Sequence, residues 1–198
     1  MPQPVERSIV NKLAYIGLGA NVTSSHGPPL LTIKEAILRL AGDSLTTRKV
    51  SNFYQTPAFP PGSGPDFVNA ALVVSTNMEP RALLTHLHEV EAGLGRERKV
   101  RWAARAIDID LIAYEDLVLP DHDTFSTWQN LPLEAQKARA PDGLVLPHPR
   151  LQDRGFVLGP LCDIAPDWRH PVLGQTAQAL FDALPEAERA ALKPIPEA

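Results

Sequence analysis

Two carboxylates set within an alternating apolar stretch constrain this chain more than any other feature of its sequence. Asp108 and Asp110 alternate with Ile107, Ile109 and Leu111. Successive residues of a β-strand point to opposite faces of a sheet, so the apolar residues can face a core while both aspartates face the other side. The carboxylates would stand about 6.5–7 Å apart, at two strand rises. Like charges that close are tolerated when a hard cation lies near them, so the pattern predicts a strand with a metal-binding face.

A basic segment lies directly before this strand and is interrupted by Glu97 and Trp102. Its cationic residues are Arg96, Arg98, Lys99, Arg101 and Arg105. One guanidinium group can donate hydrogen bonds to two phosphate oxygens at once, and carboxylates bind the cation that accompanies a polyphosphate. Together, the two segments predict phosphoryl or pyrophosphoryl transfer.

Length and composition indicate one ordinary globular domain over residues 1–198. The net charge of −4 weighs against nucleic acid as a partner, although the basic segment can still attract an anion. The lone cysteine, Cys162, cannot form an intrachain disulfide. No apolar run approaches the roughly 20 residues needed to cross a bilayer, and residues 1–12 form a polar lead-in without a signal peptide's apolar core. We therefore expect a cytoplasmic protein that binds neither nucleic acid nor membranes.

The hydrophobic periodicity predicts an α+β fold. Strands are expected at residues 13–18, 46–54, 67–75 and 106–114, and helices at residues 30–40 and 83–94. The order β-α-β-β-α-β is that of a ferredoxin-like fold, a four-stranded antiparallel sheet with two helices on one face. Asp108 and Asp110 would then lie on the open face.

The rest of the chain is expected to cover part of that open face. C-terminal helices are predicted at residues 175–184 and 186–192, and a short helix at residues 133–139. The last of these falls in a polar, proline-interrupted inserted segment, residues 116–143, for which the sequence indicates no role. Gly17 and Gly19 predict a tight turn after the first strand, because the third glycine of a dinucleotide-binding loop is missing.

Several segments, taken in order, resemble the 6-hydroxymethyl-7,8-dihydropterin pyrophosphokinase family. The segment RWAARAIDIDLI, residues 101–112, is similar to its signature. Residues 14–21, 51–57, 65–71, 147–148 and 154–158 resemble its other conserved stretches. The resemblance implies the same ferredoxin-like fold. It also implies transfer of the β,γ-pyrophosphoryl group of ATP to the pterin's hydroxymethyl oxygen, with release of AMP, in folate biosynthesis.

The resemblance assigns roles on the phosphate side of the site. Asp108 and Asp110 would hold two Mg²⁺ ions, and Arg96 and Arg105 would stabilise the transferred group. The residues expected near ATP are Glu91, Arg98, Arg101, Trp102, Ile112, His148 and Arg154. By itself, Glu91 would suit a surface acid at the end of a helix, and His148 stands in a stiff loop between two prolines.

The resemblance also assigns the pterin side. Phe67 and Phe156 would sandwich the flat pterin ring, and Asn69 would offer a donor and an acceptor to its amide-like edge. Backbone contacts are expected from Thr56, Ala58 and Phe59. The chain departs from the family pattern at Ala58 and Ala104, where prolines are common, at Phe67, where a tyrosine is frequent, and at Pro149, where an aromatic residue is frequent.

Two other functions use the same features. An open ferredoxin-like sheet can bind single-stranded RNA, although Asp108 and Asp110 would repel its phosphates. A metal-dependent phosphohydrolase could use the same aspartates, and it would act without a pterin. The expected partners of the leading hypothesis are ATP and 6-hydroxymethyl-7,8-dihydropterin, bound by a monomer or weak homodimer.

Overall fold

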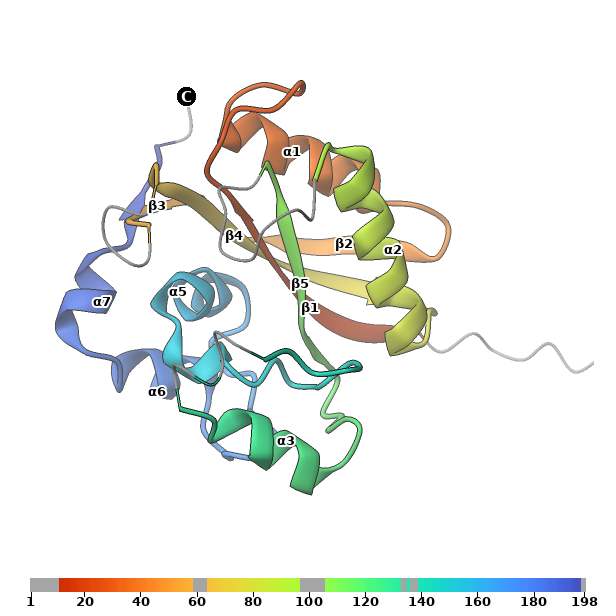
Figure 1. Cartoon of the computed structure of the whole chain (residues 1–198), viewed down its shortest axis with the longest axis vertical. Coiled ribbons are helices and arrows are strands. Elements are labelled where there is room, and N and C mark those ends of the chain that lie inside the picture. The colour runs from red at the N-terminus through yellow and green to blue at the C-terminus, as the bar shows by residue number, and fades with distance from the viewer. Residues whose placement is uncertain (1–10, 59–63, 97–105, 133–134, 136–138, 197–198) are drawn as a thin grey trace, which may run out of the picture.

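The chain forms one antiparallel sheet with helices on both faces (Figure 1). The computed structural model describes residues 11–58, 64–96, 106–132, 135 and 139–196. Within them, the strand order is β5-β1-β4-β3-β6, and β2 also pairs with β4. The strands are β1 (Lys12–Ala20), β2 (Leu45–Val50), β3 (Tyr54–Thr56), β4 (Phe67–Thr76), β5 (Asp108–Tyr114) and β6 (Lys193–Pro194). The helices are α1 (Pro29–Leu40), α2 (Pro80–Gly93), α3 (His122–Gln129), α5 (Gly155–Ile164), α6 (Ala177–Asp182) and α7 (Glu186–Ala190), with a 3₁₀ turn, η1, at Leu151–Asp153.

The expected four-stranded sheet is wrong in two details. The strand expected at residues 46–54 is two strands, β2 and β3, which both pair with β4. They separate at Ser51, whose hydroxyl accepts the Ala71 N–H at 2.8 Å in place of a backbone carbonyl. The sheet also gains β6, a two-residue edge strand on β3 that is too short to show a periodic pattern. The predicted helix at residues 133–139 lies mostly outside the described residues.

The main core lies between the sheet and the helices α1 and α2 (Figure 1). Alternate residues of β1, including Ile16 and Leu18, point to this side and are at most 3% exposed. Ile109 and Leu111 of β5 join them, as the alternation predicted. Burial of each such side chain stabilises the fold by about 1.5–3 kcal/mol. The register of β5 is therefore fixed by this core, which turns Asp108 and Asp110 to the other face.

A second core covers part of that other face. Helix α5 packs Val157, Leu158 and Leu161 against Ala71 and Val73 of β4. The sequence analysis did not predict this helix, because Gly155, Gly159 and Pro160 break the usual helical signal. Burial of α5 between β4 and α6 stabilises the helix despite its poor local helix propensity.

The inserted segment covers the far end of the same face. Phe125 of α3 is fully buried against the His170 ring, with 5.6 Å between ring centroids. The contacts continue through Trp168 to Tyr15 of β1, at 5.8 and 5.5 Å. This segment, which had no role in the sequence analysis, therefore contributes to the second face of the sheet.

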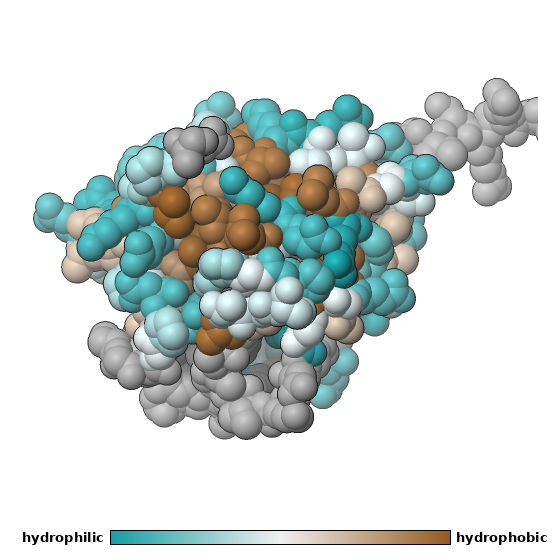
Figure 2. Space-filling view, turned by 90° about the horizontal axis from the view of Figure 1, so that it is seen from above, coloured by the Kyte–Doolittle hydropathy of each residue, from teal (hydrophilic) through white to brown (hydrophobic). Residues whose placement is uncertain are grey.

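Large hydrophobic side chains are exposed at the end of the molecule that carries α1. Figure 2 shows the end of the molecule at the top of Figure 1, where hydrophobic side chains gather in the middle and hydrophilic ones surround them. Helix α1 lies at this end and carries Leu31 and Leu38, which are 52% and 72% exposed. None of the described helices has the length and apolar character to cross a bilayer.

His170 is held neutral inside the second layer. Its Nδ1 accepts the Val172 and Leu173 N–H groups at 3.2 Å, so the ring proton sits on Nε2. Burial lowers the pKa of His170 from its usual 6.5 to about 4. The unfolded chain therefore takes up this proton first as the pH falls. The His170 contribution to stability is present above pH 6.5 and is lost as the pH falls toward about 4.

We expect His170→Asn to flatten the acid side of the stability profile, because the asparagine oxygen can accept the same N–H groups but does not titrate. Urea unfolding at a series of pH values from 7 to 4 measures this. His122→Asn, at an exposed position on α3, is the control for loss of one imidazole. A His170→Asn profile parallel to that of the unaltered protein would contradict this account.

Candidate active site

The end of α2 brings a buried acid and an arginine together. The helix ends at Gly93, and Gly95 then adopts a φ of +86°, a conformation that favours glycine. This turn lets the Arg96 N–H donate to the Glu91 carbonyl at 3.1 Å. The chain thereby folds back, and the Arg96 guanidinium donates to the Glu91 carboxylate.

Glu91 lies inside the protein, although taken alone it would suit a surface position. Its side chain is 1% exposed, and its carboxylate accepts the Ile109 N–H at 2.6 Å. Burial raises the pKa of Glu91 to about 7, against the opposing effects of the Ile109 N–H and the Arg96 charge. Glu91 therefore joins the end of α2 to the start of β5 and orients Arg96.

Asp108 and Asp110 lie on the second face of the sheet, as predicted, beside a part of β1 that has no side chains. Gly19 pairs with Asp108 on one side and with Asn69 on the other, and Gly17 pairs with Asp110. The predicted tight turn at Gly17 and Gly19 is therefore wrong, because both glycines lie within β1. Arg96 reaches Asp108 at 2.8 Å. Anionic and cationic groups thus meet beside these two glycines of β1, which we call the glycine floor.

His148 lies beside this acidic edge. Its backbone N–H donates to the Ile112 carbonyl at 2.7 Å, which docks the loop on β5. Its Nδ1 accepts the Arg150 N–H at 3.1 Å, so Nε2 carries the proton. Burial and the charge of Arg154 lower the pKa of His148 to about 3, and Asp108 opposes this only in part. The ring is therefore neutral near pH 7 and can donate one hydrogen bond from Nε2.

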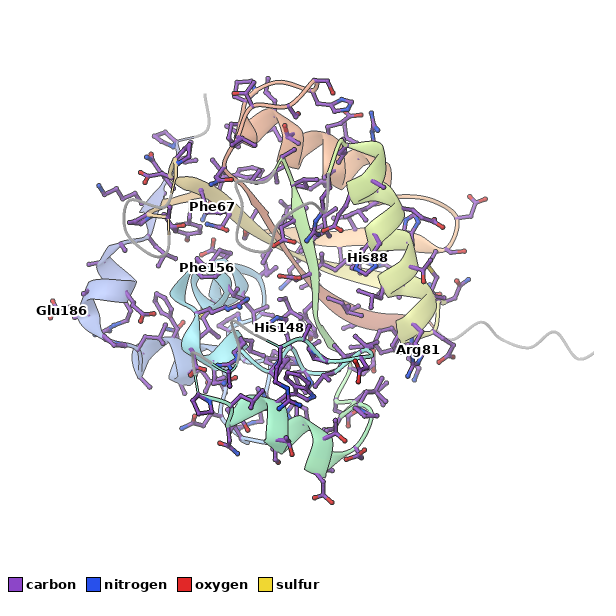
Figure 3. All side chains as sticks on the ribbon, in the orientation of Figure 1. Phe67, Arg81, His88, His148, Phe156 and Glu186 are labelled. Carbon is purple, nitrogen blue, oxygen red and sulfur yellow. The ribbon has the colours of Figure 1, made fainter. Side chains whose placement is uncertain are left out.

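The aromatic and amide groups expected on the pterin side also lie on this face. Asn69 is buried and donates to the Thr56 hydroxyl at 2.7 Å. A side chain at Gly19 would stand 3.0 Å from the Asn69 oxygen and 3.9 Å from the Phe67 ring. In the view of Figure 3, Phe67 on β4 lies directly above Phe156, with His148 below.

Phe156 stands at the start of α5 and is 38% exposed, with the Arg154 guanidinium 5.6 Å from its ring centroid. An exposed aromatic ring beside a cation can stack on a flat ligand.

Other predicted site residues fall into two groups. Ala58 and Ile112 are buried, and the Ile112 side chain lies over Gly17. The remaining predicted residues lie outside the described residues: Phe59, Arg98, Arg101, Trp102 and Arg105. Sequence reasoning missed the glycine floor, although the spacing of Gly17 and Gly19 matches that of Asp108 and Asp110 and could have indicated it.

A hollow of about 300 Å³ lies elsewhere, between β1's first residues and Trp168. Leu13 and Tyr15 line it, whereas the site described above lies at the Gly19 end of β1.

The fold and the site define an α+β protein in which two carboxylates, two arginines and two phenylalanine rings lie near one face of an antiparallel sheet. This is the arrangement expected for binding a metal-chelated polyphosphate together with a flat ligand. The chain belongs to the 7,8-dihydro-6-hydroxymethylpterin-pyrophosphokinase (HPPK) family, whose model matches residues 15–166.

Two relatives carry the name 2-amino-4-hydroxy-6-hydroxymethyldihydropteridine pyrophosphokinase. The protein of Synechocystis is 35% identical over 170 residues, which cover 85% of this chain and 74% of the relative. The protein of Methylorubrum extorquens is 35% identical over 157 residues, covering 78% and 83%. These relatives give no support to an RNA-binding module or a phosphohydrolase.

A solved structure shares the fold. A Plasmodium falciparum HPPK-DHPS triple mutant superposes with a TM-score of 0.61 at 17% identity, covering 89% of this chain and 45% of that one. At this identity the likeness concerns the fold alone.

We expect Glu91→Ala to lower the free energy of unfolding by about 2–3 kcal/mol, because it leaves the buried Ile109 N–H without its acceptor and removes one of the two carboxylates that pair with Arg96. Glu91→Gln keeps one oxygen for the Ile109 N–H and should cost about 1 kcal/mol. Urea unfolding at pH 8, where the Glu91 carboxylate is ionised, measures both. The control is Glu89→Ala, at an exposed position on the same helix. Equal stabilities for Glu91→Ala and Glu89→Ala would refute the buried pair.

Proposed function

We propose that this chain transfers the β,γ-pyrophosphoryl group of ATP to the hydroxymethyl oxygen of 6-hydroxymethyl-7,8-dihydropterin and releases AMP, as a step of folate biosynthesis. One observation carries the proposal: Gly19 separates Asp108 from Asn69 in a single row across three strands. A phosphate-binding edge and an amide-binding edge therefore flank a residue of β1 that contributes no side chain of its own. ATP bound at the Asp108 edge and a pterin bound at the Asn69 edge would therefore have their reacting groups on the two sides of Gly19.

The donor set at this edge fits Mg²⁺. Asp108 and Asp110 are partly exposed and offer hard carboxylate oxygens on one face. The described residues contain no group of three or more His, Cys, Asp or Glu that could hold a metal. Mg²⁺ is commonly bound by one or two carboxylates, with phosphate and water oxygens completing its shell. We propose that Asp108 and Asp110 hold two Mg²⁺ ions with ATP, where the metal would neutralise charge developing on the transferred group.

The cationic and neutral donors around the aspartates have separate roles in this proposal. Glu91 holds Arg96 in place, so its guanidinium can stabilise the transferred phosphoryl oxygens without reorganising. Neutral His148 donates its Nε2 proton to a phosphate oxygen, and Arg154 supplies a positive charge beside it. Arg98, Arg101, Trp102 and Arg105 are proposed to act on the same phosphates.

The pterin is proposed to bind between Phe67 and Phe156, with its polar edge toward Asn69. The Asn69 amide already donates to Thr56, so its oxygen faces the floor at Gly19 and can accept a pterin N–H. Thr56, Ala58 and Phe59 would add backbone contacts.

We further propose that β1, α1, β2–β3, β4, α2 and β5 form a ferredoxin-like unit. The strand order supports this, since β1 lies between β5 and β4.

AMP formation from ATP tests the proposal, measured with and without the pterin and with Mg²⁺ or EDTA. We expect AMP only when both the pterin and Mg²⁺ are present. Phosphate release without the pterin would indicate a hydrolase instead, and a folded protein without turnover would contradict the proposed reaction.

We expect Asp108→Asn to lower kcat by at least about 10²-fold, because one charge that holds the metal is lost. The pterin Kd, measured by fluorescence, should stay within about twofold, since Asp108 lies on the phosphate side. Asp43→Asn, on an exposed turn, is the matched control. Unchanged turnover in Asp108→Asn would remove the metal assignment.

A further inference from the structure

The carboxylate of Asp163 joins the far end of α5 to the strand that borders the pterin side. Its Oδ2 accepts the Asn52 backbone N–H at 3.0 Å and the Asn52 side-chain amide at 3.1 Å. The Tyr54 hydroxyl lies 2.9 Å from both carboxylate oxygens and donates to them. We call these three residues the Asp163 clamp.

Two further observations show that the clamp is well formed. Lys49 donates from Nζ to the Ile164 carbonyl at 2.8 Å, which satisfies one of the free carbonyls at the helix end. Burial and the Asp163 contact raise the pKa of Tyr54 to about 12, so its hydroxyl remains a donor at neutral pH. The residues between β2 and β3 are thereby fastened to α5.

The clamp connects the two sides of the proposed pterin slot. Tyr54 pairs with Asn69 in the sheet, and Thr56 pairs with Phe67. At its other end, α5 begins at Gly155, so Phe156 lies in its first turn. One side of the slot is therefore built on β3 and β4, and the other on α5.

We infer that Asp163 is a positioning residue for the pterin slot, which holds α5 against β3 so that Phe156 stays at a fixed separation from Phe67. This inference rests on the function proposed above. A flat ring stacks well only between surfaces that are held parallel at the right distance, so a looser helix would weaken pterin binding. The affinity for ATP should change much less than the affinity for the pterin, because ATP is proposed to bind at β5 and the His148 loop.

Asp163 and Asn52 are exposed, so their contacts add little to overall stability. A role in positioning therefore predicts a change in pterin affinity that is larger than any change in melting temperature.

The test compares Asp163→Ala, Asp163→Asn and Tyr54→Phe with the unaltered protein. KM for each substrate comes from AMP formation, Kd for the pterin from fluorescence, and Tm from thermal unfolding. We expect Asp163→Ala to raise the pterin KM and Kd about tenfold with ATP KM within about twofold. Asp163→Asn should raise the pterin KM and Kd less than Asp163→Ala does, because its amide oxygen can still accept a hydrogen bond from Asn52.

Tyr54→Phe removes only the hydroxyl and should also raise the pterin KM. The matched control is Glu35→Ala, which removes a surface carboxylate paired with Arg39 at 2.7 Å on α1. It should leave both KM values unchanged.

Two results would overturn the inference while the proposed function stands. One is a pterin KM for Asp163→Ala equal to that of an active unaltered protein. The other is an equal rise in both KM values, which would indicate general loosening. If the unaltered protein forms no AMP and binds no pterin, the proposed function fails, and the inference falls with it.

Discussion

β1 has two chemically different faces, and the rest of the structure depends on that difference. On one face, side chains such as Ile16 and Leu18 are buried under α1 and α2. On the other face, Gly17 and Gly19 contribute no side chains of their own, so Ile112 lies over Gly17 and the Asn69 oxygen lies beside Gly19. The apolar face fixes the register of β4 and β5, since a slip of one residue would expose their core residues. That register places Asp108 and Asn69 on either side of Gly19.

The charges around the glycine floor are held by the fold before any ligand binds. Glu91 is buried, and it joins α2 to β5 while orienting Arg96 toward Asp108. The hydrogen bond from the Arg150 N–H fixes the tautomer of His148, which burial and Arg154 keep neutral. Preorganised donors of this kind stabilise developing charge without the cost of reorientation.

The local patterns predicted much of this architecture. The alternation of apolar residues around Asp108 predicted which face of β5 is buried, and the spacing of apolar residues predicted α1 and α2. Among the predictions that failed, two concern regions where tertiary contacts decide the structure. Helix α5 contains Pro160 and two glycines, so only its burial against β4 makes it a helix. The break between β2 and β3 depends on a hydrogen bond from Ala71 to Ser51, which is distant in sequence.

For the candidate site, the sequence predicted the positions of strand residues but not the contacts between distant segments. Asp108, Asp110 and Asn69 follow from their strand positions and the family resemblance. The burial of Glu91 and the Asp163 clamp could not be predicted from the sequence, because both depend on the packing of segments that are far apart in the chain.

The most direct test is a crystal structure with Mn²⁺, the pterin and a non-hydrolysable ATP analogue, analysed by anomalous diffraction. The account predicts anomalous peaks at Asp108 and Asp110, with the pterin ring between Phe67 and Phe156. Metal bound away from these aspartates, or a pterin bound on another face of the sheet, would contradict it.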